Sequence, residues 1–199
     1  HDAVDSASVS GALEGTAWEY TYATSEDGEY SSDVPQVRNV TSGTDVWVKA
    51  YNANYGTVGP VKATATVKPA ELTATISHLE KPYDGTAELV EGNDPAVTLS
   101  GAKGDDVITA TIDASKVSYA QATVHENGDL KASPSDVALA GDEAGNYVVA
   151  KVEGTGTITP AGTEALTLSA KGYEGTYDDA DHDAVDSASV SGALEGTAW

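Results

Sequence analysis

The aspartates of one short stretch, YDDADHDAVD at 177–186, are the residues of this sequence best suited to binding a ligand. Calcium prefers several carboxylate and carbonyl oxygens, and Asp178, Asp179, Asp181 and Asp183 could supply carboxylates to one ion. Their spacing is that of neither an EF-hand loop nor a glycine-rich nonapeptide. A solvated acidic loop is therefore the competing interpretation. We expect no cofactor, and calcium held by these four aspartates is the alternative.

The remaining reactive side chains indicate no catalytic centre. The 199 residues include no Cys, which removes thiol nucleophiles, thiolate zinc sites and disulfides together. The four histidines lie far apart and without zinc-binding spacing, at positions 1, 78, 125 and 182. No G-x-S-x-G, P-loop or G-x-G-x-x-G is present. We expect no enzyme, and we assign no catalytic, cofactor-binding or metal-ligating residue.

The charge of the chain excludes further classes of partner. It carries 32 acidic and 10 basic residues, for a net charge of −22. Nucleic-acid binding needs a basic surface, and anionic membranes attract basic segments, so we expect neither as a partner. No apolar run approaches the roughly 18 residues of a membrane span. The composition favours a very soluble surface that repels itself.

The elements that must position these residues are strands. Polar and apolar residues alternate along TDVWVKAYN (44–52) and PVKATATVKP (60–69), as in half-buried strands. Similar segments recur every 8–12 residues, among them 71–79, 145–154 and 155–160. Asp27-Gly28 and Asn127-Gly128 are turn signals between strands. These patterns predict an all-β fold with no helix.

The chain contains a long repeat. Residues 1–18, HDAVDSASVSGALEGTAW, recur without change as residues 182–199, so the period is 181 residues. A fainter repeat lies inside it, because KGYEGT (171–176) resembles KPYDGT (81–86). The Asn-Tyr pairs at 54–55 and 146–147 recur at a similar offset, as do the strand ends before Ala70 and Ala161. Each period should therefore hold two related domains of about ninety residues.

The positions of these repeats predict that the chain has three parts. Residues 1–70 form a domain without its first strand, residues 71–161 form a complete domain, and residues 162–199 supply the first strand and the start of the next repeat. A domain without its first strand should expose a sheet edge. The tail could then dock onto the head of another molecule, as in domain swapping.

Two of the recurring motifs are explained by turn and corner chemistry. In Tyr-Asp-Gly-Thr, Gly supplies positive φ and Asp can bond its own backbone, so we interpret the turn as structural, with Tyr83 and Tyr173 packing at the end of the domain. Asn54-Tyr55 and Asn146-Tyr147 predict corners in which the tyrosine ring is buried.

The segment KPYDGTAEL…GDDV…AGNYVVAKVEGTGTITPA resembles the YDG/MBG group of bacterial immunoglobulin-like tandem repeat domains of cell-surface adhesins. The matching residues are Tyr83-Asp84-Gly85-Thr86, Gly104-Asp105-Asp106-Val107, Gly145-Asn146-Tyr147 and Ile158-Thr159-Pro160-Ala161. The partner domain has Tyr173-Glu174-Gly175-Thr176, 18–35 and 46–55. Glu174 in place of Asp, and the acidic insert at 178–183, depart from the usual pattern.

The resemblance implies a fold and a role. The fold would be tandem immunoglobulin-like β-sandwiches, two per 181-residue repeat, on the surface or in the cell wall of a bacterium. Each repeat would be part of an extracellular adhesin or fibre, acting as a semi-rigid stalk that projects a distal binding domain toward host protein or glycan. Its immediate partners would be neighbouring repeats of the same chain.

Three alternatives stay open. The repeats themselves could bind glycan or host protein through aromatic residues at 18, 20, 47 and 51. The chains could instead assemble into a filament by strand exchange between the head and the C-terminal tail. Such surface domains can also carry isopeptide crosslinks, for which Lys49 or Lys151 with a facing Asn or Asp are the candidates, although both also fit outward-facing strand positions.

Overall fold

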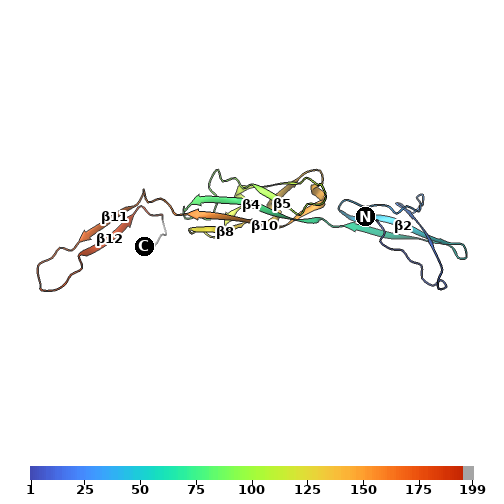
Figure 1. The fold of residues 1–199 in the computed structure, drawn as a ribbon, viewed down its shortest axis with the longest axis horizontal. Coiled ribbons are helices and arrows are strands. Elements are labelled where there is room, and N and C mark those ends of the chain that lie inside the picture. Colours follow the sequence, from blue (N-terminus) through green and yellow to red (C-terminus); the bar gives the residue numbers. More distant parts are fainter. Residues whose placement is uncertain (195–199) are drawn as a thin grey trace. The chain divides into compact units, whose positions relative to one another are not determined.

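The computed structural model of the protein describes residues 1–194, and within them the fold is all-β, as the alternation predicts. Strands and loops make up nearly all of this part of the chain, and its only helical pieces are the short 3-10 turns η1 (Ala114–Lys116), η2 (Pro134–Asp136) and η3 (Ala144–Asn146). Figure 1 shows long strands joined by loops. No helical segment in residues 1–194 has the length and apolarity that crossing a membrane requires.

Three antiparallel strands form the first sheet. They follow in chain order as β1 (Glu19–Ala23), β2 (Thr41–Asn52) and β3 (Gly56–Val67). Alternation along β2 places Val46 and Ala50 on the buried side of this sheet. The turn expected at Asp27-Gly28 lies between Tyr22 and Ser31, which form an antiparallel bridge.

Five strands form the second sheet, in the order β5-β4-β10-β8-β7. Their bounds are β4 (Ala70–Pro82), β5 (Val97–Ser100), β7 (Ser118–Tyr119), β8 (His125–Lys131) and β10 (Tyr147–Thr159). In Figure 1 the arrows of β4 and β10 point the same way. Where the two strands end, the Tyr83 N–H donates to the Thr159 carbonyl at 2.8 Å.

Two sequence expectations change in this sheet. Residues 145–154 and 155–160 form the single strand β10 rather than two strands. Asn127-Gly128 is not a hairpin turn but lies inside β8, where Gly128 is paired with Gly156. Asn127 has φ 51°, a left-handed geometry that Asn tolerates, and the ladder between β8 and β10 is irregular near Gly156. Because the ladder is irregular there, β8 accommodates Asn127 and Gly128 and continues beyond them.

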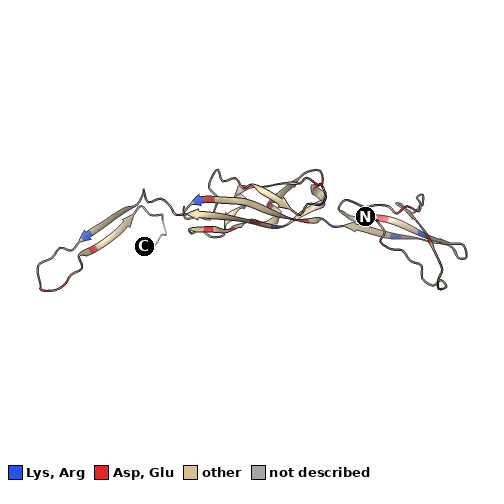
Figure 2. Cartoon of the chain, in the orientation of Figure 1, with Lys and Arg blue, Asp and Glu red and all other residues tan. Residues whose placement is uncertain are grey.

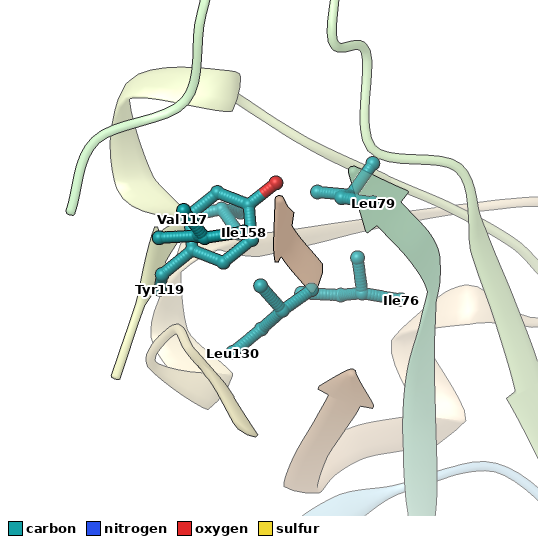
Figure 3. Packing of buried hydrophobic residues seen from close by; sticks show 6 residues of the cluster. All are labelled: Ile76, Leu79, Val117, Tyr119, Leu130 and Ile158. Carbon is teal, nitrogen blue, oxygen red and sulfur yellow. The ribbon is translucent and has the colours of Figure 1, made fainter. Parts of the chain in front are cut away.

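The core of this region has two clusters. Side chains of β4 and β10 pack against the two-stranded sheet of β6 (Thr109–Ile112) and β9 (Val137–Ala140), through Ala74, Val149 and Val137. The second cluster lies toward the other end of β4 and β10. Figure 3 shows its six buried members, Ile76, Leu79, Val117, Tyr119, Leu130 and Ile158.

The last described strands form a separate hairpin, β11 (Thr167–Gly172) and β12 (Val185–Ser191). Every residue of β11 is exposed, and only Val190 is half-buried in β12. The loop that joins the two strands carries the acidic stretch (Figure 2).

The chain divides into two compact units, which we describe separately. The first contains residues 1–72, 101–108 and 140–148, and the second contains residues 73–100, 109–139 and those from 149 onward. The first unit buries Val46, Leu72 and Tyr147, and its other buried side chains are small, among them Ala3, Ala23 and Ala50. The larger core is therefore in the second unit.

Candidate functional site

A buried lysine is the most unusual charged group in the described part of the chain. Lys81 lies near the end of β4, where it alternates with the buried Leu79, and only 1% of its surface is exposed. A buried ammonium is very costly unless it is paired and hydrogen-bonded. The surroundings of Lys81 must therefore supply full compensation.

Four oxygens surround the Lys81 ammonium. Its Nζ donates to Asp84 Oδ1 at 2.7 Å, the Glu88 carbonyl at 2.8 Å, and the carbonyl and Oγ1 of Thr86 at 2.9 and 3.1 Å. Because an ammonium has three hydrogens, all of its donors are used. The lysine thereby ties β4 to the turn and to the segment that follows it.

The Tyr-Asp-Gly-Thr turn is shaped to present these oxygens. Asp84 Oδ1 accepts from both the N–H and the hydroxyl of Thr86, each at 2.9 Å, which is the local side-chain turn that Asp favours. Gly85 has φ 84°, a geometry that Gly adopts without strain. The Lys81 ammonium, aided by the bonds from Thr86, lowers the pKa of Asp84 to about 2.

Tyr119 covers the ammonium on its core side. The Lys81 Nζ lies 5.5 Å from the centroid of the Tyr119 ring, within the range of a cation–π contact. The ring is 1% exposed, and its hydroxyl has no hydrogen-bond partner in the described structure. Burial, with Glu80 and Asp84 nearby, raises the pKa of this phenol.

The geometry supports the structural interpretation of the turn. Every polar contact of Lys81 is to the protein itself, and the ammonium has no exposed surface with which to meet a ligand. Tyr83 packs against the adjacent core cluster, as expected for the end of a domain. The sequence analysis did not single out Lys81. Its signal is an inward position in the strand, two residues after Leu79, with an acidic residue three positions later.

The corner predicted at Asn146-Tyr147 lies in the first compact unit. The Tyr147 ring is buried, as expected. Its hydroxyl donates to Asp106 Oδ2 at 2.6 Å and accepts from the Lys103 N–H at 2.8 Å. The bond to Asp106 is the main reason why the pKa of Tyr147 is raised. Asn146 Oδ1 accepts from the Val40 N–H at 2.8 Å.

The corresponding pair at Asn54-Tyr55 is different, and the expectation of a buried ring is wrong there. Tyr55 is about half exposed. Its hydroxyl accepts from the Leu13 N–H at 3.1 Å, and its ring lies 5.6 Å from that of Trp18. Tyr55 lies in the turn that joins β2 to β3, at the end of the sheet, whereas Tyr147 begins the strand β10.

The four aspartates of the calcium hypothesis lie in the loop between β11 and β12. Asp178 contacts His182 Nε2 at 3.0 and 3.1 Å, which lowers the pKa of Asp178. Asp179 accepts from the Tyr177 hydroxyl at 2.8 Å. Within residues 1–194 no three His or acidic residues gather closely enough to hold a metal ion. Calcium at Asp178, Asp179, Asp181 and Asp183 therefore stays a prediction without a preformed site.

Lys49 and Lys151, the two candidates for isopeptide crosslinks, both make other contacts. Lys151 is exposed and pairs with Glu153, which raises its pKa. The Lys49 ammonium lies 3.7 Å from the centroid of the Tyr30 ring. Neither contact is the facing Asn or Asp that an isopeptide bond would need.

Comparison with known proteins identifies one part of the chain. A family model described as the YDG domain matches residues 66–154. This segment contains the Lys81 site and the Tyr147 corner, so the resemblance to the YDG family, based on Tyr83-Asp84-Gly85-Thr86, is confirmed for that part of the chain. No curated protein and no solved structure matches the chain.

Proposed function

We propose that this chain is a structural repeat of an extracellular bacterial surface adhesin or fibre, in which the domains form a semi-rigid stalk that projects a distal binding domain. The YDG match at 66–154 supports the relationship to such repeats. The strongly acidic composition supports an extended, self-repelling array. The partners would be neighbouring repeats, with host protein or glycan bound by the distal domain.

The observation that carries this proposal is the pairing of β4 with β10. The chain enters the YDG segment through β4 and leaves it through β10, and the two strands are neighbours that run the same way. A pull on the two ends therefore loads the ladder between them in shear, so that its bonds share the force. At the far end, Thr159 Oγ1 also donates to the Lys81 carbonyl, next to the buried ammonium.

The connection into β4 is also short. Only Lys68 and Pro69 separate β3 from β4. Proline fixes its own φ and restricts the residue before it, so this connection has little freedom. Strands of 12 or 13 residues span about 40 Å at about 3.3 Å per residue. A 181-residue repeat of two such domains should then add about 80 Å to the stalk.

Small-angle X-ray scattering on proteins of one, two and three complete repeats tests the proposal. We expect the maximum dimension to grow by a constant ~80 Å per repeat. Compact or irregular growth would contradict a stalk. The same measurement with calcium and with a chelator tests the aspartate loop, because growth that is lost on chelation would place calcium at the joints.

Binding by the repeats themselves is the second candidate. Tyr51 is 48% exposed and lies on the same face of the three-stranded sheet as the half-buried Trp47, whereas Tyr20 lies on the opposite face and Trp18 precedes β1. Aromatic side chains with one exposed face are common in binding surfaces. A glycan array probed with the full chain and with Tyr51→Ser distinguishes this function, since a stalk alone binds no glycan.

A further inference from the structure

Two pieces of the YDG segment pack with the part of the chain that precedes it. The first compact unit joins residues 1–72 to residues 101–108 and 140–148, which lie inside the family match. These pieces contain two motifs on which the family resemblance rests, Gly104-Asp105-Asp106-Val107 and Gly145-Asn146-Tyr147. Neither motif has a role in the function proposed above. Both lie where the chain before β4 meets the YDG domain.

Asn146 connects these two parts through a main-chain group. Its Oδ1 accepts from the Val40 N–H at 2.8 Å, in a partly buried position. Val40 directly precedes β2 and lies outside the ladder that begins by pairing Thr41 with Val67. A buried N–H without a partner is costly, so Asn146 supplies the acceptor that the first sheet does not.

The YDG segment holds the Asn146 amide in one orientation. Asn146 Nδ2 donates to Glu143 Oε2 at 2.6 Å, so Oδ1 is the atom that faces the N–H. In the next residue, the Tyr147 hydroxyl donates to Asp106 and accepts from the Lys103 N–H. These bonds hold the loop with the first motif beside the start of β10. The acceptor is therefore positioned by contacts within the YDG segment itself.

The charges around this contact are complementary. A groove of about 530 Å³ lies beside it, and the chain before β4 lines that groove with the basic side chains of Arg38 and Lys68. The YDG segment contributes one basic and three acidic side chains, which are Lys103, Asp105, Asp106 and Glu143. Opposite charges on the two sides of an interface favour one orientation over others.

We propose that residues 103–106 and 143–147 form a socket that binds the main chain of the preceding domain, here at residues 38–40, and so holds the joint between the two domains in one orientation. Because the socket contacts a backbone N–H, it fits a preceding domain whatever side chain that residue carries. The inference rests on the proposed function for its purpose, since a semi-rigid stalk requires joints of defined orientation.

The connection between β3 and β4 does not set this orientation by itself. Proline fixes its own φ, but the ψ angles of Lys68 and Pro69 still allow rotation. Domains joined only by a linker move relative to one another by default. A second attachment away from the connection removes this freedom, and Asn146 lies far from Pro69 in the sequence.

Amide hydrogen exchange at Val40 tests the contact directly. In Asn146→Ala the Val40 N–H should exchange about fivefold faster than in the unmodified chain, as expected for the loss of one hydrogen bond. Asn54→Ala is the matched control, because Asn54 occupies the corresponding Asn-Tyr pair and its side chain makes no hydrogen bond within residues 1–194. This control should leave the exchange of Val40 unchanged. Unchanged exchange in Asn146→Ala as well would overturn the proposal.

Distances between two spin labels test whether the socket holds the joint. The chain contains no Cys, so Val61→Cys and Thr75→Cys, at exposed positions of β3 and β4, place one label on each side of the joint. We expect a narrow distance distribution that becomes clearly broader in Asn146→Ala. Val40→Pro removes the donor from the other side of the contact and should broaden it similarly. Pro69→Ala should broaden it less.

The outcomes separate the socket from the stalk. A broad distribution in the unmodified chain, or an unchanged width in both Asn146→Ala and Val40→Pro, would overturn the socket. A larger effect of Pro69→Ala would also overturn it, because the connection would then set the orientation. A narrow distribution within one chain, combined with irregular growth of proteins with two and three repeats, would support the socket and contradict the stalk. Circular dichroism checks that every variant keeps its strands.

Discussion

The motif Lys-x-Tyr-acid-Gly-Thr occurs twice in this chain, and the two lysines have opposite environments. The Lys81 side chain is completely buried and donates to oxygens of Asp84, Thr86 and Glu88. The Lys171 side chain is 70% exposed and forms an ion pair with Asp186 at 3.1 Å. A six-residue motif therefore does not by itself bury its lysine.

The difference comes from what surrounds the turn. Lys81 has Tyr119 above its ammonium and β10 beside its strand. Lys171 lies in a two-stranded hairpin whose tyrosine, Tyr173, instead stacks on His182 with 4.3 Å between ring centroids. The following substitutions test how much each surrounding group contributes.

Replacing the lysine itself should give the largest effect. Lys81→Ala removes the donor from a buried set of acceptors, and breaking a buried pair in this way costs about 3 kcal/mol or more. Lys171→Ala should change stability by less than about 0.5 kcal/mol, as expected for an exposed position. Amide hydrogen exchange in β4 and β10 measures the local opening free energy. Equal effects of the two substitutions would show that burial is not what distinguishes the lysines.

The tyrosine that covers Lys81 needs space against β10. A Cβ on Gly156 would lie 2.5 Å from Tyr119 Cε1 and 3.0 Å from Leu130 Cδ2. Gly156→Ala should therefore destabilise this region by about 2 kcal/mol, as overpacking does. Gly145→Ala is the control, because no atom lies within 4 Å of its added Cβ. Thermal unfolding of both variants measures the difference, and a neutral Gly156→Ala would mean that Tyr119 can move away freely.

Asp84 should make the stability of this region depend on pH at the acidic end. Its pKa is lowered from 3.8 to about 2 in the folded state, so its stabilising contribution is complete above about pH 4 and is lost as pH falls through 2. Asp84 is partly exposed, and screening reduces the contribution to about 1 kcal/mol. Urea unfolding at pH 5 and pH 2 should show this loss in the unmodified chain and in Glu174→Gln, but not in Asp84→Asn. A loss of equal size in Asp84→Asn would contradict the assignment.

The smallest expected effect has the opposite sign. The Tyr119 hydroxyl is buried without a partner in the described structure, and an unsatisfied buried hydroxyl is costly. Tyr119→Phe keeps the ring over Lys81 and removes this group. It should raise the free energy of unfolding by up to about 1 kcal/mol. Thermal unfolding at neutral pH measures the change, and a clear loss of stability would show that the hydroxyl has a partner.

Much of the secondary structure could be predicted from local patterns. Alternation along 44–52 and 60–69 predicted β2 and β3, because a half-buried strand requires period-2 burial. The Tyr-Asp-Gly-Thr turn was predicted as structural, because each residue type has its own turn chemistry. Local patterns failed at Asn127-Gly128, because pairing with β10 holds those residues within a strand.

The sequence by itself determined the all-β class, the recurrence of residues 1–18 at 182–199 and the absence of thiol chemistry, since these depend on residue types and their spacing alone. Only the tertiary structure decided that Lys81 is buried and Lys171 exposed, because burial depends on Tyr119 and β10, which lie far from the motif in sequence. It likewise decided that residues 4–10 form no strand and border a groove, whereas the identical residues 185–191 pair in a hairpin. Identical residues differ there because the strands available to them differ.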